Sequence, residues 1–206
     1  MADPWALIHA ERKATLDDVE GLTEDQWATQ SLCADWTVRD VLAHMTATAK
    51  MTPPRFMGKL IASGFNFKAM SAKDVAHERG ENSAEALENF RAHIGDTTHP
   101  PGPIDGMVAE ALIHGEDIRR PLGITREYPE AATTNVASFI TKSNLLLGGK
   151  RRSEGLGLKA TDASWTLGDG PEVSGPLVSI VLALTGRKAG LDGLEGEGVA
   201  TLAWRI

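Results

Sequence analysis

The sequence has little of three features that mark particular classes of protein. Among 206 residues there is a single cysteine, Cys33, which excludes an internal disulfide and is typical of a reducing compartment. No apolar run approaches the roughly 18 residues of a membrane-spanning helix, and the N-terminus lacks the apolar stretch of a signal peptide. The 21 basic residues are outnumbered by 28 acidic ones, which argues against binding to a phosphate backbone. We therefore expect a cytoplasmic protein that binds neither nucleic acid nor a membrane.

The first 121 residues carry four long amphipathic segments, which we expect to form an antiparallel helical bundle. The predicted helices cover residues 4–21, 37–52, 83–95 and 105–121. Thr37 and Asp40 have the spacing of a capping box at the start of the second helix. Residues 55–80 also read as helical but irregular, with a break near Gly64, and this segment could form a lid over a site.

The character of the sequence changes after Tyr128. The patterns predict a helix over 129–147, two short strands within 155–168, a helix that begins after Pro176, and a closing strand over 199–206. This mixture indicates a small α+β unit with its own core. The predicted fold class is therefore α+β, with a helical-bundle domain at 1–124 and a small α+β domain at 125–206.

The segment from Met107 to Arg120 contains the most informative spacing. Glu110, His114 and Asp117 lie four and three residues apart, which places them on one face of a helix. A buried carboxylate or imidazole needs a partner, and a metal ion suits a Glu and a His one turn apart. A hydrogen-bonded pair or a half-exposed helix face is the structural alternative. His44 lies at the edge of the buried stripe of the second predicted helix, where it could meet Glu110 and His114.

Three segments together resemble a known family. WATQSLCADWTVRDVLAHM (27–45), EALIHGEDIRRPLG (110–123) and DGPEVSGPLVSIVLALTGRKAGLDGLEGEGVATL (169–202) are similar to signatures of the mycothiol-dependent maleylpyruvate isomerase family. The N-terminal half resembles the wider group of DinB-like metal-binding four-helix bundles. The resemblance implies a divalent metal, usually zinc, held by His44, Glu110 and His114. It also implies that the Thr-Gly-Arg turn directs Arg187, as a catalytic residue, toward the active-site cleft.

The resemblance implies an enzyme that uses a low-molecular-weight thiol, mycothiol, as a metal-bound nucleophile. Its substrate would be a small electrophile, either isomerised like maleylpyruvate or joined to the thiol, and the protein would be a monomer or a homodimer. Asp117 would support a ligand or pair with a nearby arginine. Cys33 precedes His44 by about three helical turns, so we expect it to lie too far away, roughly 15 Å, to share the same ion.

Two other classes of function stay open. One is a metal-dependent hydrolase in which the open metal position activates water. The other is a non-catalytic stress or regulatory protein that binds metal. An open site with three ligands argues weakly against the second, because structural zinc sites are usually closed by four protein ligands.

Overall fold

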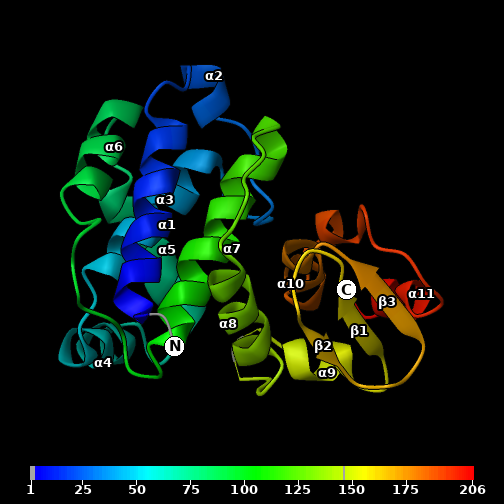
Figure 1. Cartoon of the computed structure of the whole chain (residues 1–206). Helices are drawn as coiled ribbons and strands as arrows, with labels where there is room; N and C mark the ends of the chain where they lie inside the picture. The colour runs from blue at the N-terminus through cyan, green and yellow to red at the C-terminus, as the bar shows by residue number, and fades with distance from the viewer. Residues whose placement is uncertain (1–2, 146) are drawn as a thin grey trace. The chain divides into compact units, whose positions relative to one another are not determined.

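The computed structural model describes residues 3–145 and 147–206, which form two compact units divided along the chain between Thr125 and Arg126. The first unit contains α1 (Pro4–Val19), α2 (Glu24–Trp27), α3 (Val38–Ala49), α4 (Pro53–Ala62), α5 (Phe67–Glu78), α6 (Ser83–Arg91) and α7 (Asp105–Leu122) (Figure 1). The second contains α8 (Glu130–Ile140), α9 (Gly149–Ser153), β1 (Gly157–Ala160), β2 (Thr166–Leu167), β3 (Glu172–Gly175), α10 (Leu177–Leu184), the 3-10 helix η1 (Lys188–Leu191) and α11 (Val199–Trp204). The predicted α+β fold class is confirmed.

Four helices of the first unit form a closed bundle. α1 packs on α7, α7 on α3, α3 on α6, and α6 on α1, while α5 covers a further face of α3. The core between them is apolar, because each helix buries its hydrophobic stripe against its neighbours. Its buried members include Leu16, Val19, Val41, Leu42, Met45, Phe90 and Ile118. The second and fourth predicted helices therefore do face each other, as α3 and α7.

Local sequence signals set the ends of α3 and α7. The Thr37 side chain accepts a hydrogen bond from the backbone N–H of Asp40, and the Asp40 carboxylate accepts one from the backbone N–H of Thr37, so the predicted capping box is present. Gly123 ends α7 in the left-handed conformation, with φ of 69°, which glycine adopts without a steric penalty. These caps fix the start of the helix that carries His44 and the end of the helix that carries His114.

Gly115 allows α1 and α7 to approach closely. A Cβ atom at this position would lie 2.4 Å from a guanidinium nitrogen of Arg119 and 3.2 Å from the hydroxyl of Thr15. Arg119 uses the space to donate from Nε to Asp18 at 2.5 Å and from Nη2 to Thr15 at 3.0 Å. The glycine thus makes room for a buried polar link between the two helices.

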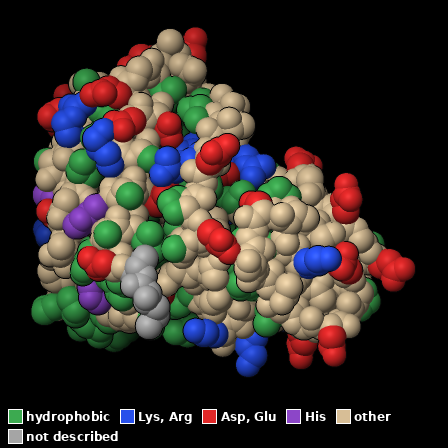
Figure 2. Space-filling view, viewed as in Figure 1, with side chains coloured by type: hydrophobic (Ala, Val, Ile, Leu, Met, Phe, Trp, Pro, Cys, Tyr) green, Lys and Arg blue, Asp and Glu red, His purple; other side chains and the backbone are tan. Residues whose placement is uncertain are grey.

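The segment 53–78 forms a hairpin of α4 and α5, and the predicted break near Gly64 is confirmed. Gly64 and Phe65 both have positive φ, and Phe65 is 70% exposed. Met57, Ile61 and Phe67 are also exposed, and hydrophobic side chains gather over α4 at the lower left of Figure 2. Among the residues described, no helix is both long and apolar enough to cross a membrane.

The second unit is built around α10, which is apolar and almost fully buried. It packs against α8 and against a three-stranded sheet with the order β2-β1-β3. β1 pairs antiparallel with β2 and parallel with β3, with Leu158 opposite Leu167 and Val173. The predicted hairpin of two short strands is therefore confirmed. Whether the two units are independent domains, with the boundary predicted at 124/125, stays a prediction.

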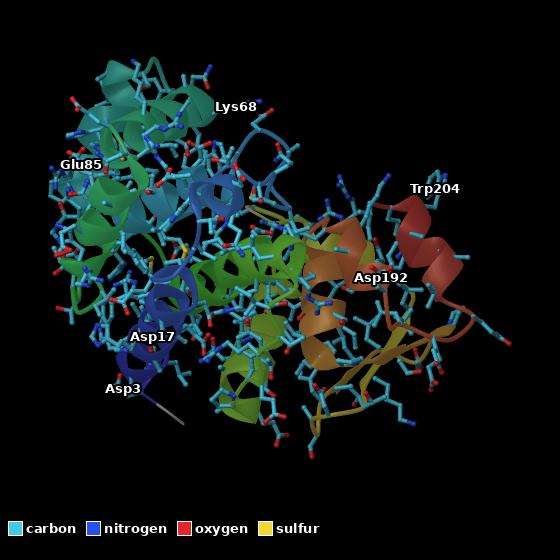
Figure 3. All side chains as sticks on the ribbon, turned by 90° about the horizontal axis from the view of Figure 1, so that it is seen from above. Asp3, Asp17, Lys68, Glu85, Asp192 and Trp204 are labelled. Carbon is cyan, nitrogen blue, oxygen red and sulfur yellow. The ribbon has the colours of Figure 1, made fainter. Side chains whose placement is uncertain are left out.

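Three predictions for this unit are wrong. The helix expected over 129–147 ends at Ile140. The strand β3 was missed, because Glu172–Gly175 reads as part of a turn-rich stretch in sequence. The closing segment is the helix α11 rather than a strand. Leu202 of this helix is buried, whereas Trp204 is 87% exposed and projects away from the helix (Figure 3).

Candidate metal centre

The centre of the first unit carries the polar face of α7. Glu110, His114 and Asp117 follow one another along this helix, among the buried apolar residues Ala111, Leu112, Ile113 and Ile118. The α-helical spacing places successive members of the set about one turn apart. A polar stripe that runs through an apolar core must find its partners inside the bundle.

His44 of α3 meets this stripe from the opposite helix. Its ring centroid lies 4.8 Å from that of His114, with the two rings nearly perpendicular. The ring centroid of Trp36 lies 4.8 Å from that of His44, and the two ring planes are tilted by 35°. The hydroxyl of Ser71 on α5 lies 3.5 Å from His44 Nδ1. The two histidines are therefore brought together at the α3–α7 interface.

Glu110 is the least satisfied member of the set. Both of its carboxylate oxygens are buried, and neither has a hydrogen-bond partner among the residues described. Burial raises the pKa of Glu110, while the charges of His114 and Arg12 oppose that rise. A buried carboxylate without partners is costly unless a cation or a donor completes it. The orphaned oxygens thus fit a divalent cation held by the Glu110 carboxylate.

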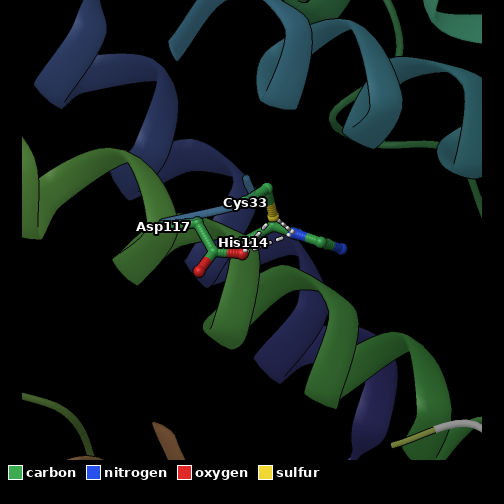
Figure 4. A group of neighbouring side chains, drawn as sticks. All are labelled: Cys33, His114 and Asp117. Atoms are coloured by element: carbon green, nitrogen blue, oxygen red, sulfur yellow. Dashed lines mark hydrogen bonds and ion pairs between the residues drawn. The ribbon is translucent and has the colours of Figure 1, made fainter. Parts of the chain in front are cut away.

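His114 is oriented by a carboxylate on its own helix. Its Nδ1 lies 2.9 Å from Oδ2 of Asp117, and the Cys33 thiol donates to the same oxygen at 3.1 Å. Figure 4 shows the other ring nitrogen of His114, Nε2, pointing away from Cys33 and Asp117. A carboxylate behind a histidine in this way fixes the ring and leaves the far nitrogen to act as a ligand.

The two imidazoles have opposite electrostatic surroundings. Burial, followed by the charge of His114, lowers the pKa of His44 to about 3, so this ring is neutral near pH 7. Burial also lowers the pKa of His114, but its hydrogen bonds to Asp117 and Cys33 and their charges outweigh that effect and raise the pKa to about 10. In the metal-free protein, His44 is therefore neutral and His114 carries a positive charge over a wide pH range.

The position of Cys33 corrects the expectation that it lies far from the site. Its sulfur is 3.9 Å from His114 Nδ1. The expected separation treated residues 33–37 as an extension of the helix axis, whereas the loop folds back. Gln30 donates from its side chain to the carbonyls of Cys33 and Trp36, both at 2.8 Å, and the backbone N–H of Leu32 donates to the carbonyl of Asp117.

The described residues contain one close group of possible metal ligands, which differs from the predicted set of His44, Glu110 and His114. The possible ligand atoms of Cys33, His114 and Asp117 all lie within 4.8 Å of one another. These atoms already satisfy each other through hydrogen bonds, however, whereas the Glu110 oxygens have none. Two imidazoles and a carboxylate are donor types that suit a divalent metal, so His44, Glu110 and His114 fit such an ion by their chemistry. That ligand set stays a prediction.

Several residues near this centre were not singled out from the sequence. Trp36 and Ser71 flank His44, and Arg12 on α1 interacts electrostatically with Glu110. Their spacing in the sequence carries no periodic signal, because they come from a loop and from two further helices. Arg187 lies in the second unit, where its Nη1 donates to the Thr185 carbonyl at 3.0 Å. Its predicted catalytic role is not tested by that contact.

Comparison with known proteins finds one similar family and two similar solved structures. Residues 8–99 match the family described as the mycothiol maleylpyruvate isomerase N-terminal domain. The crystal structure of the mycothiol-dependent maleylpyruvate isomerase is similar over 94% of this chain and 91% of that one, with 17% identity and a TM-score of 0.64. A mutant of that enzyme with histidine replaced by alanine matches over the same shares, with 17% identity and a TM-score of 0.65. No curated protein matches the chain. Residues 8–99 are therefore similar to the N-terminal domain of the mycothiol maleylpyruvate isomerase family, and the chain shares its fold with the solved enzyme.

Proposed function

We propose that the protein is a metal-dependent enzyme that uses mycothiol, or a closely related low-molecular-weight thiol, as its nucleophile. His44, Glu110 and His114 would hold the divalent metal, for which zinc is the best candidate because two imidazoles and a carboxylate form a known zinc-binding set with an open position. When bound, this ion would lower the pKa of a thiol in the open position so that the thiolate persists near neutral pH. The observation that carries the proposal is the pair of buried Glu110 oxygens, which have no hydrogen-bond partner among the described residues and feel the charge of His114. The ring of His114 lies 4.8 Å, centroid to centroid, from that of His44, whose lowered pKa keeps it neutral.

The residues of the chain would prepare the site for an anionic ligand. Two neutral imidazoles and one carboxylate leave a dication with a net charge of about +1, which one thiolate balances. Asp117 would hold His114 by its Nδ1, and the Trp36 indole would shield His44 from water. In the second unit, Arg187 would bind a carboxylate of the substrate or of the thiol.

The reaction would be one of two that a thiol nucleophile supports. Reversible addition of sulfur to a conjugated cis double bond allows the bond to rotate before the thiol leaves, as isomerisation of a maleylpyruvate-like substrate requires. Attack on another small electrophile with retention of the sulfur is a thiol transfer. We place the enzyme in the cytoplasm, where a reducing environment keeps thiols such as Cys33 reduced.

Ligand-dependent melting tests the proposal. Mycothiol at about 100 times its Kd should stabilise the zinc-loaded protein by about 2.7 kcal/mol, which corresponds to roughly 5 to 10 °C in a chain of this size. His44→Ala should lose the shift, whereas Cys33→Ala should keep it because Cys33 lies on the Nδ1 side of His114. If zinc-loaded protein ignores thiols and instead hydrolyses esters or amides, the function is that of a metal-dependent hydrolase.

A further inference from the structure

Arg12 is a fully buried cation in the middle of α1. Its Nη1 donates to the backbone carbonyl of Asp96 at 3.1 Å. Its Nε and Nη2 are buried as well, and neither has a hydrogen-bond partner among the residues described. An arginine is not retained in a bundle core for packing alone, since burying its charge without a counter-charge is unfavourable.

Glu110 is the matching anion across the α1–α7 interface. Its two oxygens are buried and unpartnered in the same way, and the two helices pack directly on each other. Burial lowers the pKa of Arg12, and the charges of Glu110 and Asp96 oppose that change. Each of the two side chains therefore has unused hydrogen-bonding atoms and lies in the electrostatic field of the other.

We propose that Arg12 is a positioning residue for Glu110, supplying the buried counter-charge that holds this carboxylate ready to bind metal. The inference rests on the proposed function in taking Glu110 as a metal ligand. Asp117 supports His114 from one side of the site, and Arg12 supports Glu110 from another. Outer groups of this kind commonly affect metal binding almost as strongly as the ligands themselves.

A double-mutant cycle in the metal-free protein tests the pairing directly. Arg12→Met keeps the bulk of the side chain and removes its charge, and Glu110→Gln keeps the shape of the carboxylate and removes its charge. Arg12→Met alone should raise the unfolding equilibrium constant by roughly 100-fold, because it removes one of the two positive charges, those of His114 and Arg12, that offset the burial of the Glu110 carboxylate. In the Arg12→Met background, adding Glu110→Gln should lower the unfolding equilibrium constant again by about tenfold.

The matched control is Arg119, which is equally buried but pairs with Asp18 and Thr15. Arg119→Met combined with Glu110→Gln should be additive within about twofold. The same additivity for Arg12→Met and Glu110→Gln would overturn the inference. If Arg12→Met alone is too unstable to measure, the double variant should still fold, and a double variant that fails equally would also overturn it.

Zinc affinity gives a second readout that simple loss of packing would not change. Competition with a chelator of known affinity should show roughly tenfold weaker binding in Arg12→Met. Arg12→Lys keeps the charge and should recover part of that loss, whereas equal losses in both variants would contradict a role for the charge. Failure of the wild-type protein to bind zinc would refute the proposed function, while an additive metal-free cycle refutes this inference alone.

Discussion

Zinc binding to the proposed site of His44, Glu110 and His114 should strengthen as the pH rises. In the metal-free protein, His44 is neutral because its pKa is lowered to about 3. His114 carries an additional proton and a positive charge because its pKa is raised to about 10. A metal ligand must offer a lone pair, so zinc has to displace the proton from Nε2 of His114. Below a pKa of about 10 that proton is present in almost every molecule.

The size of the effect follows from that single proton. Between pH 6.5 and 8.5 the apparent zinc affinity should rise about tenfold per pH unit, or roughly 100-fold in total. A histidine with an ordinary pKa near 6.5 would give only a shallow rise over the same range. Protonation of Glu110, whose pKa is raised by burial, would steepen the curve further at the acidic end.

Isothermal titration calorimetry in two buffers with different ionisation enthalpies measures the proton directly. We expect about one proton released per zinc bound at pH 7.5, and a chelator competition series should show the corresponding slope. Asp117→Asn is the informative control, because it removes the carboxylate that raises the pKa of His114. Binding that is independent of pH over this range, with no proton released, would refute the reasoning.

Further predictions concern individual side chains. Asp117→Asn should weaken the limiting zinc affinity at high pH roughly 10- to 100-fold, measured by chelator competition, since His114 loses the acceptor at 2.9 Å that orients its ring. The same variant should flatten the pH dependence, because the carboxylate that raises the pKa of His114 is gone, and an unchanged limiting affinity would argue against the orienting role. Arg187→Lys should already lower thiol-dependent turnover, because lysine lacks the planar two-point donor geometry, and full activity in Arg187→Ala would end the proposed role. Phe65→Gly should raise the free energy of unfolding by roughly 0.5 to 1 kcal/mol in urea denaturation, because φ at this exposed position is 61°. Phe67→Gly, at the first position of α5, should instead be destabilising, and the opposite pattern would contradict this explanation.

Periodicity predicts the part of the site that lies on regular helices. The spacing of Glu110 and His114 gives their common face, and the capping box of Thr37 and Asp40 gives the start of the helix that carries His44. Both signals are local, so one helix alone decides them. The contact between His44 and His114 across the α3–α7 interface was expected because the buried stripes of neighbouring helices face each other in a bundle.

The parts of the site that depend on chain reversal could not be read from the sequence. Cys33 reaches Asp117 only because the side chain of Gln30 and the backbone of Leu32 close the preceding loop. Arg12 is seven residues from the nearest Trp and shows no local pattern that distinguishes it from a surface arginine. Near the C-terminus, Val199–Trp204 alternates like a strand but forms a helix, since tertiary packing of Leu202 outweighs weak β-propensity in so short a segment.

The crowding of Glu110, His114 and Asp117 onto a single helix limits how the gene for this protein can change. Each residue advances the helix by about 100°, so one inserted or deleted residue between Glu110 and His114 would turn everything downstream away from the site. Point substitutions at the apolar positions between them would only repack the core. We therefore expect functional variants of this protein to differ freely in loop length, for example around residues 96–104, while the span from 110 to 117 keeps its length.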